Sequence, residues 1–348
     1  MNQQGKTYLK NGIIFLFVLG LLAYVYVKID LTTLVSNLEE ANYFWVGIAF
    51  IVGILSHLIR AIRWKMLIKP LGYEVSTKNS FYSVMTGYLI NMATPRMGEI
   101  GRCAMLYKTD GVPVEKLVGT VVIERLFDLI IMLLITAAVI FLQFDLIGDF
   151  ITANLSSDQD SSSYLVKTIM VVLVLAFGIG AYIFYQKLKP RMKAHPKLSK
   201  VVHFIDGGID GVKSIFKLKN PLLFIAYSLL IWVMYFLMTY TIFFAIDGTS
   251  HLGIDAALTT LIMGTLAMII PVPGGVGAFE YLVPKGLVLY GINESVGTAY
   301  ALVSHGTQLV MIIIVGGVSM ILAGMISKKG KAKAAANVES EANNSAEL

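Results

Sequence analysis

Charged residues are scarce in this chain of 348 residues. Asp, Glu, Lys and Arg make up 14% of it and hydrophobic residues 56%, whereas soluble domains carry about 25% charged residues. So few charges cannot cover a water-facing surface. The composition therefore excludes a soluble enzyme, a disordered chain and a nucleic-acid-binding module. The formal net charge of +6 needs an explanation other than nucleic acid.

Cysteine pairs and metal-binding patterns are also missing. Cys103 is the single cysteine, so no disulfide can form within the chain. The five histidines are scattered, and no His-Glu-x-x-His run occurs. We therefore expect no metal site and no cofactor.

Long uncharged runs are what the chain has in quantity. About 20 mostly apolar residues let a helix cross a bilayer. Runs without Asp, Glu, Lys or Arg occupy 11–27, 42–59, 79–95, 168–186, 221–246, 256–279, 286–293 and 295–327, and a further helix is expected over about 117–143. No small-residue cleavage site follows the first run, so we expect it to be retained. The sequence predicts an all-α, polytopic helical membrane protein with about six full spans.

The distribution of basic residues predicts the orientation of these spans. Acidic and basic loops alternate, and most of the 28 Lys and Arg residues fall in loops that alternation places on one side. Basic loops stay cytoplasmic, so we expect a cell (inner) membrane protein with both termini in the cytoplasm. The 187–220 segment is basic and amphipathic. It is either a helix that lies on anionic lipid or a linker that is basic only because cytoplasmic loops carry an excess of Lys and Arg.

One polar run breaks the alternation. The run 79–95 has basic residues on both sides and ends at Pro95, so we interpret it as a re-entrant hairpin. The second half repeats the layout in the opposite direction, with Pro273 at the place of Pro95. This pattern is typical of an inverted-topology repeat with interrupted helices. We expect a single transmembrane domain over 1–328, with repeats at about 10–145 and 164–327, and a disordered cytoplasmic tail over 329–348.

The first charged motif surrounds the break at Pro95. Proline removes a backbone donor and ends the incoming helix, and Gly98 permits close backbone packing. Arg96, Glu99 and Arg102 are spaced by three, so they share one face if a helix resumes there. Two arginines and one glutamate suit a phosphate, which Arg can bind with two hydrogen bonds. The alternative is a solvated cytoplasmic loop with an intrahelical ion pair.

The second motif places Glu124, Arg125 and Asp128 near the start of an apolar helix. An unpaired charge at the bilayer centre costs roughly 2.5–3.5 kcal/mol. We therefore expect the two carboxylates to pair with Arg96 or Arg102. Such pairs clamp the re-entrant loop, bind substrate, or do both.

The third motif cannot form a regular membrane helix, because it holds two prolines and three glycines: Pro271, Pro273, Gly274, Gly275 and Gly277. A helix expected over 278–292 follows, with Glu280 in its first turn. The positive end of such a helix attracts anions. The alternative is a kinked hinge that binds no ligand.

Together, the three motifs resemble those of the transmembrane region of lysylphosphatidylglycerol synthases, a flippase-like family, and the resemblance covers about 10–328. In chain order the motifs read P-x-x-G-E-x-x-R, E-R-x-x-D and P-x-P-G-G-x-G-x-x-E. The resemblance implies a bacterial or archaeal polytopic membrane protein that acts on lipids or moves them. Fused members carry a soluble aminoacyltransferase domain. Only about 20 residues follow the last helix here, so lysyl-lipid synthesis is not carried over. Relatives commonly have arginine where this chain has His305, which leaves a third cationic contact in question.

The leading hypothesis is a protein that translocates a phospholipid or a lipid-linked anion. Its candidate substrate-binding residues are Arg96, Glu99, Arg102, Glu124, Arg125, Asp128, Glu280 and His305. The two breaks are expected to meet near the midplane and to place Glu99 and Glu280 in one polar cavity. The alternatives are an enzyme of lipid head groups with Glu99 or Glu280 as base, and an accessory protein of a membrane synthase. The expected partners are membrane lipids with an anionic head group and no nucleic acid; a membrane-protein partner or a homo-oligomer stays open.

Overall fold

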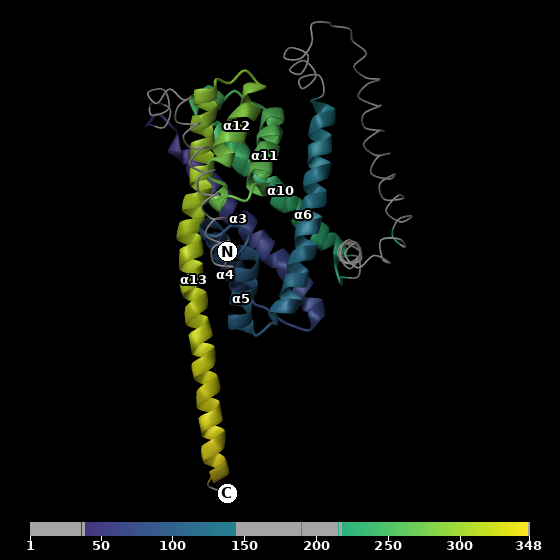
Figure 1. Ribbon diagram of the computed structural model, residues 1–348, viewed down its shortest axis with the longest axis vertical. Helices are drawn as coiled ribbons and strands as arrows, with labels where there is room; N and C mark the ends of the chain where they lie inside the picture. Colours follow the sequence, from purple (N-terminus) through teal and green to yellow (C-terminus); the bar gives the residue numbers. More distant parts are fainter. Residues whose placement is uncertain (1–35, 37–38, 144–188, 190–214, 216–217, 347–348) are drawn as a thin grey trace, which may run out of the picture.

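The computed structural model describes residues 39–143 and 218–346, together with the single residues 36, 189 and 215 (Figure 1). Every regular element in this part of the chain is helical, which confirms the predicted class. The elements in chain order are α3 (Tyr43–Ile68), η1 (Lys69–Leu71), α4 (Thr77–Ala93), α5 (Gly98–Asp110), α6 (Val114–Leu142), α10 (Pro221–Phe243), η2 (Asp247–Thr249), α11 (Ile254–Ile269), η3 (Pro273–Gly275), α12 (Ala278–Val288) and α13 (Glu294–Ala346).

Four of the described helices are long and apolar enough to cross a membrane. They are Tyr43–Leu71, Val114–Leu142, Pro221–Phe243 and Glu294–Ser327. The spans expected at 11–27 and 168–186 lie outside the described residues, as does most of the 187–220 linker. The total of six spans therefore stays a prediction.

Two helices extend further than the sequence indicated. The expected span 42–59 continues to Ile68, so Arg60 and Arg63 belong to α3 and not to a loop. The charges do not end the helix because both guanidinium groups are buried and paired with carboxylates. At the other end of the chain, α13 continues to Ala346 through most of the 329–348 tail for which we expected disorder. Alanine, lysine and glutamate are frequent there, and all three favour helix.

The first broken element is a hairpin of α4 and α5. At its open end the Asn79 amide donates to the Asp110 carboxylate at 3.0 Å. At its tip the Gly98 amide donates to Oδ1 of Asn91 at 2.7 Å. The run 79–95 is thus one limb only, and α5, which we expected in a cytoplasmic stretch, is the returning limb. The tip turns because the proline at position 95 cannot continue the helix.

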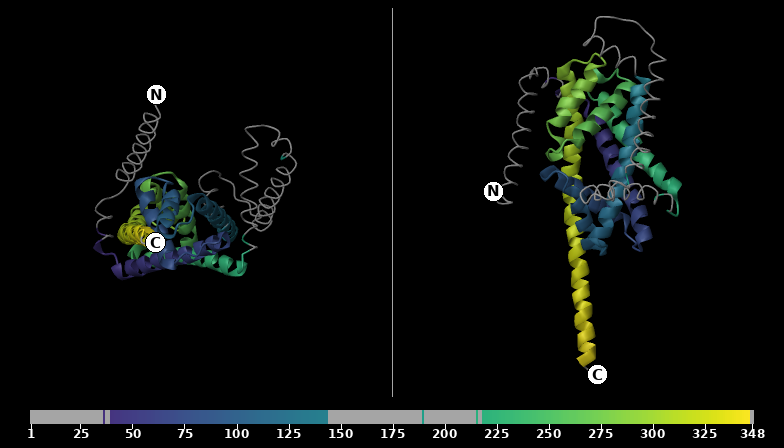
Figure 2. Two further views of the ribbon diagram at one scale, coloured as in Figure 1. Left: turned by 90° about the horizontal axis from the view of Figure 1, so that it is seen from below. Right: turned by 45° about the vertical axis from the view of Figure 1, so that its right-hand side comes forward.

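The second broken element is a hairpin of α11 and α12, joined through η3. The Phe279 ring lies against Gly264, and Met263 lies against Gly286, so the two helices run side by side in opposite directions. Figures 1 and 2 show the two hairpins at opposite ends of the helical bundle, with their tips toward each other. The tips are in contact, because Arg96 donates to the carbonyl of Ile269 at 3.3 Å.

Cysteine labelling tests this arrangement. In a Cys103→Ser background, we expect Glu74→Cys and Lys108→Cys to react from the cytoplasmic side and Ser250→Cys from the outer side. All three positions are exposed, and the first two lie at the open end of the α4–α5 hairpin. The measurement is labelling by an impermeant maleimide before and after permeabilisation. Reaction of positions 74 and 108 from opposite sides would show that α4 and α5 together cross the membrane.

Candidate functional site

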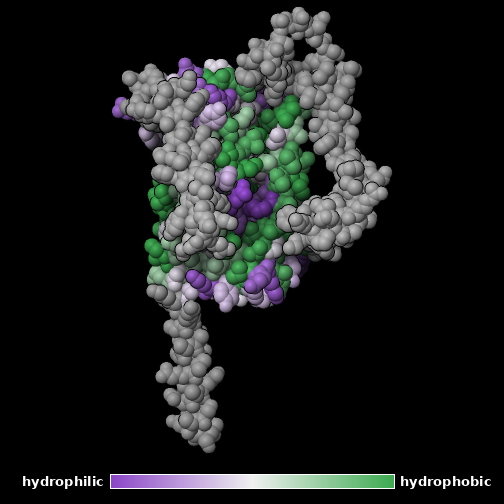
Figure 3. All heavy atoms as spheres, viewed as in Figure 1, coloured by the Kyte–Doolittle hydropathy of each residue, from purple (hydrophilic) through white to green (hydrophobic). Residues whose placement is uncertain are grey.

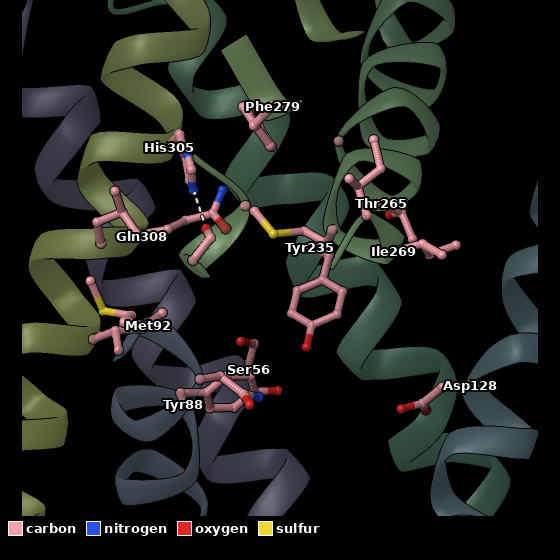
Figure 4. A pocket seen from close by; sticks show the side chains of 18 of the residues that line it. Ser56, Tyr88, Met92, Asp128, Tyr235, Thr265, Ile269, Phe279, His305 and Gln308 are labelled. Atoms are coloured by element: carbon pink, nitrogen blue, oxygen red, sulfur yellow. Dashed lines mark hydrogen bonds between the residues drawn. The ribbon is translucent and has the colours of Figure 1, made fainter. Parts of the chain in front are cut away.

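A cavity of about 480 Å³ lies where the two hairpin tips meet. Its walls include Pro95 and Arg96 from the first tip and Pro271, Gly274 and Gly275 from the second. Full-length helices close the remaining sides, with Ser56 of α3 and Asp128 of α6 on the wall (Figure 4). Both sequence breaks therefore border one cavity.

The cavity is lined by both polar and apolar side chains. The polar ones include Ser56, His57, Arg60, Tyr88, Asn91 and Tyr235. The apolar ones are mostly methionine, leucine and isoleucine, among them Met132, Met238, Leu261, Met268, Leu309 and Ile312. An amphipathic molecule with a charged head can contact both kinds of side chain.

A buried ion-pair network adjoins the cavity and includes two of its lining residues, Arg60 and Asp128. Arg60 donates to Glu124 at 3.0 Å and to Asp128 at 2.8 Å. Arg63 donates to the same two carboxylates at 2.9 and 2.6 Å, and Arg102 donates to Glu124 at 2.9 Å. Because the Glu124 side chain is fully buried, these three arginines supply the stabilisation that water would otherwise give.

Polar and aromatic neighbours complete this network. The Tyr235 hydroxyl accepts a hydrogen bond from Arg60 at 2.8 Å, and the Ser228 hydroxyl accepts one from Arg63 at 3.0 Å. The Arg102 guanidinium lies 4.6 Å above the Trp64 ring, which favours a cation. The network thereby ties α3, α5, α6 and α10 together.

Arg125 is the least neutralised member of the group. Its nearest carboxylate oxygens, on Glu99, Glu124 and Asp128, are 3.8–4.0 Å away, and its side chain is 39% exposed. Counting the network and Arg96, which also lines the cavity, five arginines face three carboxylates. Two positive charges are left over, and Arg96 and Arg125 lie at the cavity wall, where they favour an anion.

Arg96 is held in an uncommon backbone conformation. Its φ of 65° is the single positive value among the non-glycine residues that the structure describes. Such a conformation costs of order 1–3 kcal/mol and persists where surrounding structure enforces it. Here it carries the guanidinium across the cavity to the opposite hairpin tip, at the Ile269 carbonyl.

Glu280 and His305 fasten the second tip. One Glu280 oxygen accepts from the Gly277 amide at 2.7 Å, and the other lies 2.6 Å from Nδ1 of His305. Nε2 of His305 lies 2.9 Å from the Gly274 carbonyl, a contact drawn in Figure 4, and the Phe279 ring stacks on the imidazole. We expected the start of α12 to attract an external anion, but its own Glu280 carboxylate caps it.

The candidate residues divide into two groups. On the cavity wall lie Arg96, Glu99, Arg125, Asp128 and His305, with the break residues Pro95, Pro271, Gly274 and Gly275. Behind the wall lie Arg102, Glu124 and Glu280, with Gly98, Pro273 and Gly277. Glu99 and Glu280 thus do not share the cavity, because Glu280 turns toward Gly277 and His305. Arg102 does pair with Glu124, as expected, but Arg96 pairs with neither Glu124 nor Asp128.

Sequence reasoning missed two central residues. The expected span 42–59 leaves Arg60 and Arg63 in the loop that follows it, yet they are the main partners of Glu124 and Asp128. A signal was present: Arg60 and Arg63 lie one turn apart on the continuation of an apolar helix, as the two carboxylates do on α6. Buried charges need partners, so matching these two pairs would have found the network.

The described helices and the cavity define a polytopic helical membrane protein in which two broken hairpins meet at a charged cavity. The chain belongs to the family described as Lysylphosphatidylglycerol synthase TM region, which matches residues 12–316. The UPF0104 membrane protein MJ1595 of Methanocaldococcus jannaschii is 27% identical over 342 residues, which cover 91% of this chain and 95% of the relative. A UPF0104 membrane protein of Methanothermobacter thermautotrophicus is 24% identical over 311 residues, covering 80% and 85%. No solved structure shows a significant match.

Proposed function

We propose that this protein binds the anionic head group of a membrane lipid in the cavity and translocates the lipid between leaflets. The observation that carries the proposal is a cavity lined by polar and apolar side chains, with more arginines than carboxylates around it, placed where two oppositely directed hairpins meet. Such breaks in matching halves are typical of substrate sites in transporters. The name of the family refers to synthesis of a lysyl-lipid, which supports a lipid as the substrate class.

The position of the charges supports passage of a charged head group through the hydrocarbon region. Arg96 is exposed, and Glu99 and Arg125 are partly exposed. Figure 3 shows hydrophilic side chains gathered midway between the two ends of the visible face, with apolar side chains around them. A charge is expensive in hydrocarbon unless polar groups or water accompany it. A polar surface at this depth lowers that cost for a head group.

The two tips suggest which parts move. The ion-pair network holds α3, α5, α6 and α10 as one unit. The α11–α12 tip meets the first hairpin through packing of η3 against α4 and a hydrogen bond from Arg96 to Ile269, at 3.3 Å. We expect translocation to involve displacement of one tip against the other, which exposes the cavity to alternate sides.

Substitution of the two cavity arginines tests the proposal. In vesicles with a fluorescent phospholipid, the protein should speed the movement of the label between leaflets, measured by dithionite quenching. Arg96→Gln and Arg125→Gln should each slow it about tenfold, the effect of losing one charge-assisted hydrogen bond. Arg96→Lys and Arg125→Lys should retain part of the rate, because they keep the charge and lose the planar fork.

The control is Lys69→Gln, which removes an exposed cation outside the cavity and should leave the rate unchanged. Phosphatidylglycerol, phosphatidylethanolamine and a polyprenyl phosphate are compared as labelled substrates. A wild-type rate equal to that of protein-free vesicles for all three lipids would contradict the proposed function.

A further inference from the structure

A second hollow adjoins the cavity on the outer side of the helices. It is an apolar groove between α5 and α6 with a volume of about 340 Å³. Its lining residues are Glu99, Ile100, Val118, Val121, Val122, Arg125, Leu126 and Leu129. Three of them, Glu99, Arg125 and Leu129, also line the cavity. Groove and cavity therefore adjoin at these three side chains.

The groove faces away from the helical core. Val118, Val122 and Leu129 are 38%, 39% and 44% exposed, and their spacing puts them on one stripe of α6. On α5, Ile100 is 50% exposed. The two charged residues of the groove, Glu99 and Arg125, also line the cavity. The other lining residues of the groove are apolar.

The cavity alone is too small for a whole lipid. Its volume lies within the usual range for sites that hold small molecules, about 300–1,000 Å³. A head group fits such a space, and long acyl chains have to lie elsewhere. The groove borders the cavity at Arg125, whose partly exposed side chain can bind the phosphate that joins a head group to its apolar part.

We propose that the groove between α5 and α6 holds an acyl chain of the lipid whose phosphate lies at Arg125, so that the substrate enters sideways from the bilayer. The inference rests on the proposed function and specifies its substrate: a phosphate carried on a lipid, not a free anion from water. Surrounding lipid tails are as apolar as the groove, so the groove adds little affinity. It fixes the position of the chain, and Arg125 supplies the attraction.

Photo-crosslinking tests the occupant. The full chain is reconstituted in vesicles of phosphatidylcholine and phosphatidylglycerol with a trace of phosphatidylglycerol that carries a diazirine in one acyl chain. Val122→Trp fills the groove. Leu134→Trp is the matched control, since Leu134 is 65% exposed on the same helix and lines neither hollow. Melting of the purified variants establishes that both are folded.

We expect illumination to label peptides that contain residues 100 and 118–129 in the wild type and in Leu134→Trp. In Val122→Trp this label and the rate of lipid translocation should both fall about tenfold. The groove assignment would be overturned if the two variants were labelled equally or if the label spread evenly over the helices. Translocation by the wild type would in that case still support the proposed function. Labelling of the groove in a wild-type protein that does not translocate lipid would support the acyl-chain site and contradict the proposed function.

Two further experiments distinguish a lipid from a free anion and from a second copy of the chain. Uptake of radiolabelled inorganic phosphate into the same vesicles, unchanged by Val122→Trp, would make the substrate a free anion and overturn the inference. A disulfide between two copies of Val122→Cys in the Cys103→Ser background would show that a second copy covers the groove, and would also overturn it. We expect neither phosphate uptake nor a disulfide-linked dimer.

Discussion

Replacing Glu124 by glutamine is expected to lower the free energy of unfolding by about 3–5 kcal/mol. Glu124 is fully buried and accepts hydrogen bonds from Arg60, Arg63 and Arg102. Glutamine has nearly the same shape but no charge, so three buried guanidinium groups lose their shared anion. The measurement is denaturant unfolding of the purified protein in mixed micelles.

The matched control is Glu115→Gln. Glu115 lies on the same helix but is exposed, so its substitution should change stability by no more than about 0.5 kcal/mol. A second test pairs Glu124→Gln with Arg102→Met, which removes one of the uncompensated cations. The double variant should be more stable than the sum of the two single effects predicts. Strictly additive effects would show that Arg102 and Glu124 do not interact.

Gly98→Ala should have the second large effect, because it places a methyl group at the crossing of the first hairpin. A Cβ at position 98 would lie 2.1 Å from the Gly87 carbonyl oxygen and 2.6 Å from the side chain of Asn91. The two helices have to separate to admit it. Overpacking of this kind costs about 1–3 kcal/mol, and more where backbone has to move. Because Asn91 also lines the cavity, lipid translocation should fall with stability.

Gly306→Ala is the control for that substitution. Gly306 lies within α13, and a Cβ there meets nothing within 4 Å. Alanine is favoured over glycine in a helix interior by roughly 0.5–1 kcal/mol, so this variant should be as stable as the wild type or slightly more so. If Gly98→Ala unfolds at the same denaturant concentration as Gly306→Ala, α4 and α5 do not cross at these glycines.

Local chemistry was enough to determine the class of the protein and the places where its helices break. A run of about 20 apolar residues has few options besides a membrane helix. Pro95 and the segment 271–277 interrupt helices because of their own backbone geometry. The order of the charged motifs likewise led to the family. These properties belong to short stretches of chain, and they do not depend on what packs against them.

The partners of the charged residues were decided by tertiary structure alone. By hydropathy, the span ends before Arg60. Helix α3 nevertheless continues, because carboxylates from α6 neutralise Arg60. Hydropathy cannot reveal this pairing, since Arg60 and Glu124 are 64 positions apart. Arg102 is buried and Arg96 reaches the cavity, although both lie in one motif. Glu280 caps its own helix and leaves the cavity to His305. A charge in hydrocarbon is stable only with a partner, and helix rotation and packing determine which partner it meets.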